Sequence, residues 1–249
     1  MNTSVYFSIN RTICVDKAQE RHNPVFRKLA LATLKKRAFT CELCHFVDTK
    51  LQQVVTRNQK YTDADFREDN LMVVCPHCYY GNRLGYAAVN NAIDIIYCPD
   101  IEQSALNHMT RTLMHFADKE PSAYLQSIQN DMSDSEKADR QDMMHFASTI
   151  LCELDQSKLQ AREVYQDFRP ERLSQLVSFL FNLDDEQYAK RDKFFEPFRY
   201  ILKPNVMREL NKTYSHTVFK NFTPENTLAA SDQFLSSLNV KAKNSSLGA

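Results

Sequence analysis

Tryptophan is absent from this chain of 249 residues, and glycine is nearly absent. The three glycines are Gly81, Gly85 and Gly248. They are too few for the many tight turns of an all-β fold or for a glycine-rich phosphate loop. Apolar residues make up 43% of the chain, which is enough for a core in one large domain or two modest ones. We therefore expect a mainly helical α+β fold.

An excess of charge is also missing, because 31 basic residues balance 31 acidic ones. Proteins that bind a duplex through its phosphates usually carry a basic excess, so this balance counts against nucleic acid as the partner. No apolar run approaches the length of about 18 residues that a membrane span needs, and residues 1–7 lack the basic and apolar parts of a secretory signal. These features predict a cytoplasmic protein without direct membrane insertion.

What the sequence does contain is two C-x-x-C knuckles. The first is Cys41-Glu42-Leu43-Cys44, and the second, Cys75-Pro76-His77-Cys78, follows after thirty residues. Four thiolates can surround one tetrahedral ion, and in a reducing compartment such pairs are more typical of a metal site than of disulfides. We predict a structural Zn²⁺ bound by Cys41, Cys44, Cys75 and Cys78. A redox or iron–sulfur role and a chance pattern are the alternatives.

Four cysteine ligands fill the coordination shell, so the site has no open position for a reactive water. Its expected role is folding, since zinc-finger peptides gain roughly 10–16 kcal/mol from the metal. We expect His45 and His77 to be peripheral to the ion. The gap between the knuckles exceeds the usual zinc-ribbon spacing of about 15–20 residues, so the intervening segment should have structure of its own.

Apolar periodicity predicts the elements around the knuckles. Asn23 is a plausible N-cap with Pro24 in the first turn, and a helix should end at Arg37. Short strands are expected within residues 5–15, 51–55 and 93–97, and a short helix or turn at 79–86, while residues 69–74 lead into the second knuckle. Further helices are expected from residue 101 to about 116 and over 143–168, 173–183, 186–202, 205–216 and from Thr223 onward.

The pattern also suggests a division of the chain. Residues 1–118 would form a zinc-binding domain, 119–142 a polar linker, 143–240 a helical region and 241–249 a disordered tail. Outside the knuckles we expect His108 and His115 to be ordinary helix residues. The isolated cysteines Cys14, Cys98 and Cys152 should be buried or half-buried.

The order of knuckle, strand, loop, Asn70-Leu71 and knuckle resembles the zinc-stapled branch of the HNH endonucleases. The resemblance implies a ββα unit in which a histidine at the end of the first strand is the general base. A second histidine after the second knuckle would help hold a catalytic cation. Here the strand residues are Val54, Val55 and Thr56, and Tyr79 follows the second knuckle. Valine cannot accept a proton, and tyrosine is a poor replacement for a metal-binding imidazole. We therefore predict no catalytic residues.

A closer resemblance is to the IcmJ/DotN family of type IVB (Dot/Icm) secretion systems. It is carried by residues 39–46, Gln53-Val54-Val55, Asn70-Leu71, the second knuckle, and residues 95–107 from Ile95-Ile96-Tyr97-Cys98-Pro99 onward. The resemblance implies a non-nuclease, HNH-like zinc protein at the cytoplasmic side of the inner-membrane coupling complex. Its partners there would be the C-terminal extension of the DotL-like coupling ATPase and other coupling-complex proteins.

Three hypotheses follow from these observations. The first is a zinc-stabilised adaptor, for which Tyr79, Tyr80 and Tyr86 are candidate partner contacts because tyrosine is favoured at interfaces. The second is a divalent-metal-dependent HNH-type nuclease in which carboxylates (Asp48, Asp63, Asp65 or Glu68) or His77 replace the missing histidines. The third is a zinc-finger nucleic-acid binder that uses the basic helix of residues 27–37.

Overall fold

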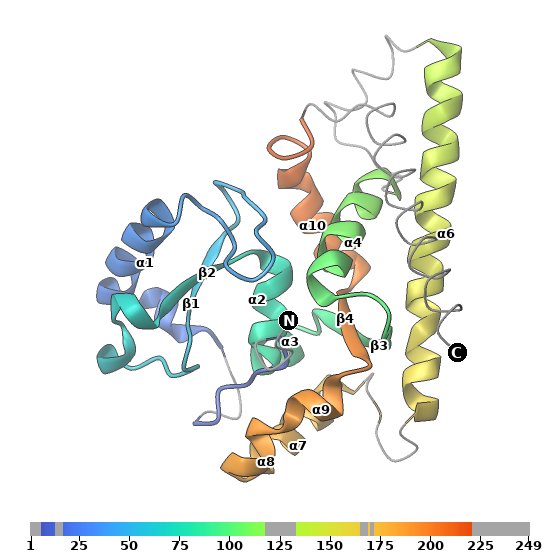
Figure 1. The fold of residues 1–249 in the computed structure, drawn as a ribbon. Helices are drawn as coiled ribbons and strands as arrows, with labels where there is room; N and C mark the ends of the chain where they lie inside the picture. Colours follow the sequence, from blue (N-terminus) through green and yellow to red (C-terminus); the bar gives the residue numbers. More distant parts are fainter. Residues whose placement is uncertain (1–5, 13–16, 118–132, 165–168, 170–171, 221–249) are drawn as a thin grey trace, which may run out of the picture.

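The computed structural model describes residues 6–12, 17–117, 133–164, 169 and 172–220 (Figure 1). Its first half contains η2 (Gln19–His22), α1 (Pro24–Lys36), β1 (Gln53–Thr56), η3 (Asp63–Asp65), η4 (Glu68–Asn70), β2 (Leu71–Val74), α2 (Pro76–Asn82), α3 (Leu84–Val89), β3 (Ile93–Tyr97) and α4 (Gln103–Ala117). Its second half contains α6 (Asp134–Val164), α7 (Leu173–Asn182), α8 (Asp185–Ala189), α9 (Arg191–Phe195), β4 (Phe198–Leu202) and α10 (Pro204–Tyr214). Helices surround two two-stranded antiparallel sheets, which confirms the predicted mixture of helix and sheet.

Helix α1 begins as its sequence predicts. The Asn23 side chain accepts hydrogen bonds from the main-chain N–H of Val25 and of Phe26 at 2.9 and 3.2 Å, and Pro24 occupies the first turn. These contacts satisfy amide groups that have no partner inside the helix. Phe26 and its neighbours pack on Val54 and Val73, so α1 covers the outer face of the first sheet.

The segment between the knuckles is a hairpin. Strands β1 and β2 pair in antiparallel register, with Val54 opposite Val73. Their connection contains η3, which is closed by a capping box between Thr62 and Asp65. Strand β2 leads directly into Cys75, and α2 starts at the next residue. The expectation that the long gap has structure of its own is confirmed.

The second sheet joins distant parts of the chain. Strand β3 was expected, but β4 lies where the periodicity predicts one helix over 186–202, and that prediction is wrong. The chain instead forms the short helices α8 and α9 and then pairs β4 with β3, with Ile95 opposite Tyr200. Aromatic and β-branched residues between Pro197 and Pro204 favour a strand, and its partner lies about a hundred residues earlier in the chain.

Tyr200 on β4 connects this sheet to the second knuckle. Its hydroxyl donates a 2.9 Å hydrogen bond to the main-chain carbonyl of His77, and its ring lies directly against Gly81. A Cβ atom at position 81 would meet the ring at 2.2 Å. The scarce glycine is therefore required here for a close approach rather than for a turn.

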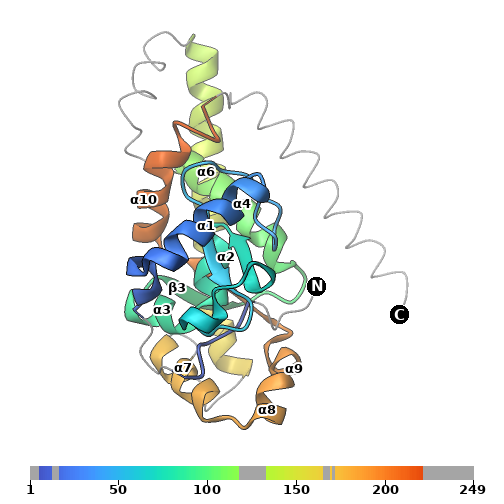
Figure 2. The same cartoon turned by 90° about the vertical axis from the view of Figure 1, so that its left-hand side faces the viewer.

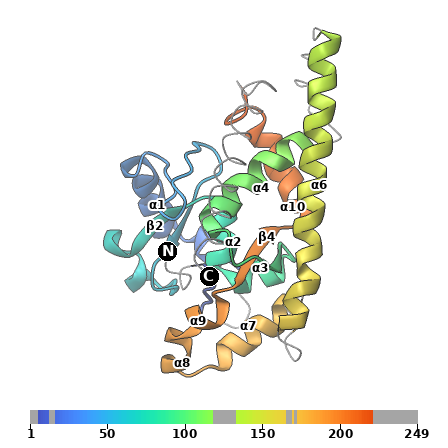
Figure 3. The ribbon, with the colours of Figure 1, turned by 45° about the vertical axis from the view of Figure 1, so that its right-hand side comes forward.

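The long helix α6 packs along α4 and β3, on the side of the molecule opposite α1 (Figures 1 and 3). Viewed from the side of α1, α7–α9 lie at one end of the molecule, α6 reaches the other, and α10 lies beside α4 (Figure 2). Helix α6 begins at Asp134, inside the stretch expected to be a linker. None of the described helices combines the length and apolar character of a membrane span.

The N-terminal segment does not form the expected strand in its described part, residues 6–12. The alternating Phe7 and Ile9 are buried as a strand's inner face would be, but the backbone is irregular. Ser8 instead bridges α2 and α3, since its N–H donates to Gly81 and its carbonyl accepts from Leu84. Phe7 stacks on Phe195 at 4.5 Å. Residues 119–132, the expected helix from Thr223, the tail and Cys14 lie outside the described residues.

Candidate metal centre

The first knuckle is a tight turn attached to β2. The main-chain N–H of Cys41 donates to the Phe46 carbonyl at 2.9 Å, and His45 turns the chain with a φ of 60°. Glu42 fastens this turn to the hairpin, because its N–H donates to the Val73 carbonyl at 2.8 Å and its carboxylate accepts from the Val73 N–H at 3.1 Å. Glu42 also forms an ion pair with Arg57.

The second knuckle is positioned by the start of α2. Cys75 is the N-cap residue, Pro76 opens the helix and Cys78 lies in its first turn. Residues three positions apart lie on the same side of a helix. Both thiols therefore point from the junction of β2 and α2 toward the first knuckle.

The four predicted cysteines come together. Their sulfur atoms all lie within 4.8 Å of one another, and the Cys44 and Cys75 sulfurs are 3.5 Å apart. A tetrahedron with metal–sulfur distances of about 2.3 Å places its sulfurs about 3.8 Å apart. The cluster thus has the size of a four-thiolate metal site. Within the described part of the chain, it is the group of metal-ligating side chains assembled closely enough to hold an ion.

The cluster is deeply buried, with Cys41, Cys75 and Cys78 at 0% exposure. Burial raises the pKa of the Cys75 and Cys78 thiols well above the ordinary range, because a thiolate loses its hydration there. A divalent cation reverses this preference, since coordinated thiols are deprotonated. Ionisation of Cys75 and Cys78 therefore requires a positive partner.

Helix α4 covers the cluster with polar side chains on successive turns. Asn107 Nδ2 donates to the Cys78 sulfur at 3.3 Å, and Arg111 donates to the Cys75 sulfur at 3.4 Å. Between them, His108 Nε2 lies 2.7 Å from the Cys44 carbonyl oxygen. Such outer contacts orient ligands and adjust their basicity.

Arg111 is a buried cation beside the sulfurs, a position that suits negatively charged thiolates. Its side chain is 2% exposed, and its guanidinium lies 3.5 Å from the centre of the Phe46 ring. No carboxylate of the described residues forms an ion pair with it. Burial opposes its charge most strongly, but the sulfurs of Cys75, Cys44 and Cys78 and the Tyr214 hydroxyl together raise the pKa of Arg111. A buried cation needs a counter-charge, and four metal-bound thiolates would supply it.

The histidines differ from one another. His45 is exposed, as a peripheral residue should be. His77 is 1% exposed and both ring nitrogens lack hydrogen-bond partners; burial lowers its pKa well below the usual value. His108 was expected to be an ordinary helix residue, but it contacts the knuckle. Residues 107, 108 and 111 form no sequence motif. The sequence therefore gives no sign that side chains of α4 cover the cysteine cluster.

No protein-family model matches the chain, and no curated protein is significantly similar to it.

The positions at which the HNH resemblance would place chemistry are occupied by packed side chains. Val55 and Thr56 are fully buried in β1. Asn70 is used structurally: its side-chain N–H group donates to the Asp65 carbonyl at 2.9 Å, and its oxygen accepts from the Asn58 N–H at 3.2 Å. Of the proposed alternative carboxylates, Asp48 is buried and accepts main-chain N–H groups of residues 50 and 51.

The tyrosines after the second knuckle form a cluster around Arg83. The Arg83 guanidinium is buried, forms an ion pair with Glu20 and donates to the Tyr79 hydroxyl at 3.1 Å. Tyr79 is 3% exposed, and burial raises its pKa to about 12. It therefore cannot contact a partner directly. Tyr80 and Tyr86 are half-buried and therefore still present surface to a partner.

The remaining free cysteines are unremarkable in position. Cys98 is half-buried, in agreement with its prediction, whereas Cys152 is exposed on α6 and the prediction for it is wrong. An apolar stripe on a helix does not decide whether a flanking residue is covered by another element.

Proposed function

We propose that this protein is a non-catalytic, zinc-stabilised interaction module, and that its partner is the C-terminal extension of a type IVB coupling ATPase. The observation that carries the proposal is the hairpin β1–β2 and helix α2, joined by four clustered cysteines. Val55 and Tyr79 are buried there at the positions where the resembled nucleases carry imidazoles. What supports a structural ion is the buried four-thiol donor set together with the counter-charge of Arg111.

In this proposal Zn²⁺ would be held by Cys41, Cys44, Cys75 and Cys78, and the ion would supply cross-linking rather than chemistry. The knuckles would keep α1, the hairpin and the tyrosine cluster in one arrangement. The remaining helices would add surface for coupling-complex proteins. The adaptor role comes from the resemblance to the IcmJ/DotN family.

The test is co-purification of the zinc-loaded protein with the cognate ATPase tail. We expect a stable complex that survives gel filtration, and metal analysis should give about one zinc per chain. A folded, metal-loaded protein that leaves the cognate tail unbound would contradict the adaptor role. A Cys75→Ser, Cys78→Ser variant should lose both zinc and the complex, because the surface loses its scaffold.

The second candidate is a divalent-metal-dependent nuclease, favoured by the same ββα arrangement. It is tested with supercoiled plasmid in the presence of Mg²⁺, Mn²⁺ or Ni²⁺. Nicking that disappears in a folded Asn70→Ala variant would establish the enzyme and overturn the proposal. We expect no nicking above that of the variant.

A further inference from the structure

Helix α1 carries a concentration of positive charge. The sequence contains no aspartate or glutamate between Glu20 and Glu42. Within that stretch, α1 and its C-cap residue supply five cations, which are Arg27, Lys28, Lys35, Lys36 and Arg37. The chain as a whole balances 31 basic residues with 31 acidic ones, so the charge of this helix is a local feature.

Three of these cations have no carboxylate partner. Lys36 forms an ion pair with Glu68, and Arg37 lies 3.7 Å from the carboxylate of Glu42. The other three side chains are exposed and form no ion pair within the described part of the chain: Arg27, Lys28 and Lys35. The helix therefore retains three uncompensated positive charges.

The helical repeat places these charges on one side of α1. The buried residues of the helix are Phe26 and Thr33. At 3.6 residues per turn, Lys28, Leu31 and Lys35 follow one another along the opposite side. We call this side the basic face and define it by its exposed residues, Arg27, Lys28, Leu31, Ala32 and Lys35. The helix lies across the side of the molecule that is turned to the viewer in Figure 2.

Leu31 lies at the centre of the basic face, and 52% of its surface is exposed. One exposed leucine is ordinary by itself, but this one has lysines three positions before it and four positions after it. Contact with a lipid surface combines buried apolar area with the attraction of Lys and Arg to anionic headgroups. The basic face offers both.

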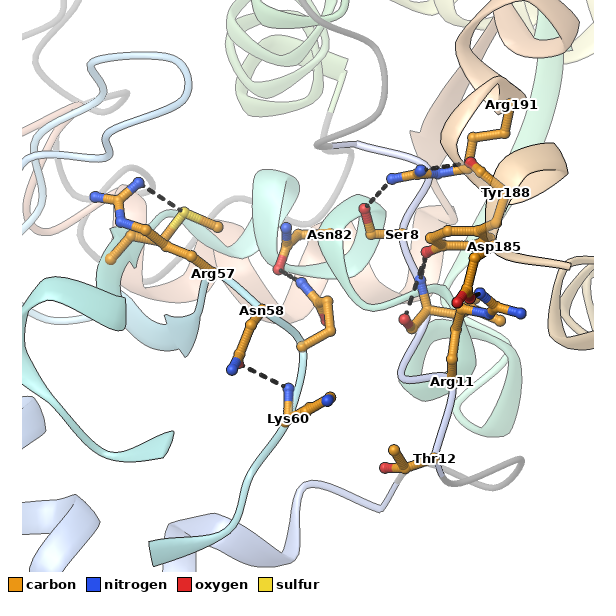
Figure 4. A pocket seen from close by; sticks show the side chains of 13 residues that line it. Ser8, Arg11, Thr12, Arg57, Asn58, Lys60, Asn82, Asp185, Tyr188 and Arg191 are labelled. Carbon is orange, nitrogen blue, oxygen red and sulfur yellow. Dashed lines mark hydrogen bonds and ion pairs between the residues drawn. The ribbon is translucent and has the colours of Figure 1, made fainter. Parts of the chain in front are cut away.

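A cleft of about 590 Å³ between the hairpin end and the N-terminal segment also contains cations (Figure 4). Its arginines each have a carboxylate close by, in the pairs Arg11–Asp185, Arg57–Glu42 and Arg191–Asp192. Most of the positive charge of the cleft is therefore compensated within the molecule, in contrast to that of the basic face.

The basic face suits a lipid surface better than a nucleic acid. It contains no amide or hydroxyl side chain to read base edges, and no aromatic ring on which a base would stack. The outer side of a helix is convex, so it meets a flat partner without needing a recess. An anionic lipid surface attracts Lys and Arg side chains that come near it, and its boundary region accepts an apolar side chain.

We infer that the basic face of α1 binds the surface of a bilayer that contains anionic phospholipids. Arg27, Lys28 and Lys35 would contact the headgroup phosphates, and Leu31 would reach the boundary with the acyl chains. The contact is peripheral and reversible, because three cations and one leucine provide a modest attraction. The inference does not depend on the proposed ATPase partner.

The direct test is co-sedimentation of the full-length, zinc-loaded protein with phospholipid vesicles. We expect binding to vesicles made of phosphatidylglycerol and phosphatidylcholine in equal parts, and none to vesicles of phosphatidylcholine alone. The bound protein should be released as salt is raised, because salt screens exposed charges. Equal binding to both kinds of vesicle, or binding to neither, would overturn the inference.

Charge reversal locates the contact. Lys28→Glu should weaken binding to the anionic vesicles by about fivefold or more, since one cation near such a surface contributes roughly that factor. The matched control is Lys193→Glu, the same change at an exposed position of α9, which should leave the affinity unchanged. Equal loss in both variants, or no loss in Lys28→Glu, would show that α1 is not the contact.

An added charge gives a test that does not rely on loss of binding. Ala32 is an exposed residue of the basic face, and lysine is a good helix former. Ala32→Lys should tighten binding to the anionic vesicles by about threefold or more. Binding to phosphatidylcholine alone should stay absent, which distinguishes the gain from exposure of core residues. Unchanged or weaker binding in this variant would contradict the inference.

The absence of tryptophan from the chain allows a direct probe of the lipid contact. Leu31→Trp places an indole at the centre of the basic face, and its emission should shift to shorter wavelength when anionic vesicles are added, because the ring leaves water. Leu159→Trp is the control, since Leu159 is 58% exposed on α6, on the side of the molecule opposite α1. No shift in Leu31→Trp, or an equal shift in both variants, would argue against the contact.

Two further measurements separate this inference from a nucleic-acid site and from the proposed function. Displacement of the protein from vesicles by a short duplex oligonucleotide, at a lower phosphate concentration than the lipid provides, would assign the basic face to nucleic acid and overturn the inference. If the ATPase tail co-purifies with the protein but anionic vesicles do not bind it, the adaptor role stands and the lipid contact fails. If the vesicles bind with the expected variant pattern but the tail does not, the lipid contact stands and the adaptor role fails.

Discussion

Arg111 is the residue that most directly links the fold to the chemistry of the four cysteines. Its guanidinium is buried against the Phe46 ring and donates to the Cys75 sulfur. A zinc ion with four thiolates carries two net negative charges, which are costly to bury without a compensating cation. Arg111 would therefore stabilise the ionised form of the ligands when a metal ion is bound in this apolar core.

We expect Arg111→Met to lower zinc affinity by about 10–100-fold, the usual effect of losing an outer-shell contact. The measurement is competition with a chromophoric chelator, together with Co²⁺ absorption to show that four thiolates still bind. Arg111→Lys keeps the charge and should recover part of the affinity. Thr112→Ala, one position along α4, is the control. Affinity in Arg111→Met equal to that of the control would show that the thiolates need no counter-charge.

The close packing of Gly81 allows a second prediction about a single residue. A Cβ atom there would lie 2.2 Å from the Tyr200 ring. Gly81→Ala should reduce the free energy of unfolding by about 1–3 kcal/mol, the usual cost of overpacking. Denaturant titration followed by circular dichroism measures it.

The Gly81→Ala, Tyr200→Leu double variant identifies the cause of that loss. A smaller side chain at position 200 gives the new methyl group room, so the two costs should be clearly less than additive. Strict additivity would mean that the glycine is needed for a reason other than contact with Tyr200.

Strand β4 is held on both edges, by another strand on one side and by a single side chain on the other. It pairs with β3 on one edge. On the other edge, the Gln103 side chain of α4 accepts from the Tyr200 N–H at 3.0 Å and donates to the Tyr200 carbonyl at 2.9 Å. One buried amide thus satisfies both main-chain groups that a third strand would have satisfied.

Replacing that amide tests how β4 is held. Gln103→Leu leaves the two Tyr200 backbone groups unpaired and should destabilise the protein by roughly 1–3 kcal/mol for each of them. Gln103→Glu keeps an acceptor for the Tyr200 N–H and should cost less. Chemical denaturation gives both values, and a Leu variant as stable as wild type would show that water replaces the amide.

Elements with local signals were predictable from the sequence, and elements that depend on distant partners were not. The Asn23-Pro24 start of α1 satisfies its own amide groups, and the four cysteines of the metal centre are identified by spacing alone. Strand β4 depends on β3, on Gln103 and on Gly81, none of which lies near it in the chain. The cover of Asn107, His108 and Arg111 likewise exists only once α4 packs on the knuckles.

At the scale of the whole molecule, the core extends across the boundary that the sequence suggested near residue 118. The cluster that contains the four cysteines also contains Leu176, Phe198 and Tyr214. Phe46 and Arg111 contact Tyr214 of α10, and β4 completes a sheet begun by β3. Loss of the ion should therefore destabilise the elements on both sides of that boundary.

We expect removal of zinc by a strong chelator to unfold the elements from α1 to α4 and those from β4 to α10 in one transition. The physical reason is that the buried thiols lose their cross-link and leave Arg111 without a counter-charge in the same core. Hydrogen exchange with mass spectrometry distinguishes the parts: β2, β3, β4 and α10 should lose protection together, at one chelator concentration. Protection that persists in β4 and α10 after β2 has lost it would instead establish two independent folding units, because a shared core does not permit one half to open alone.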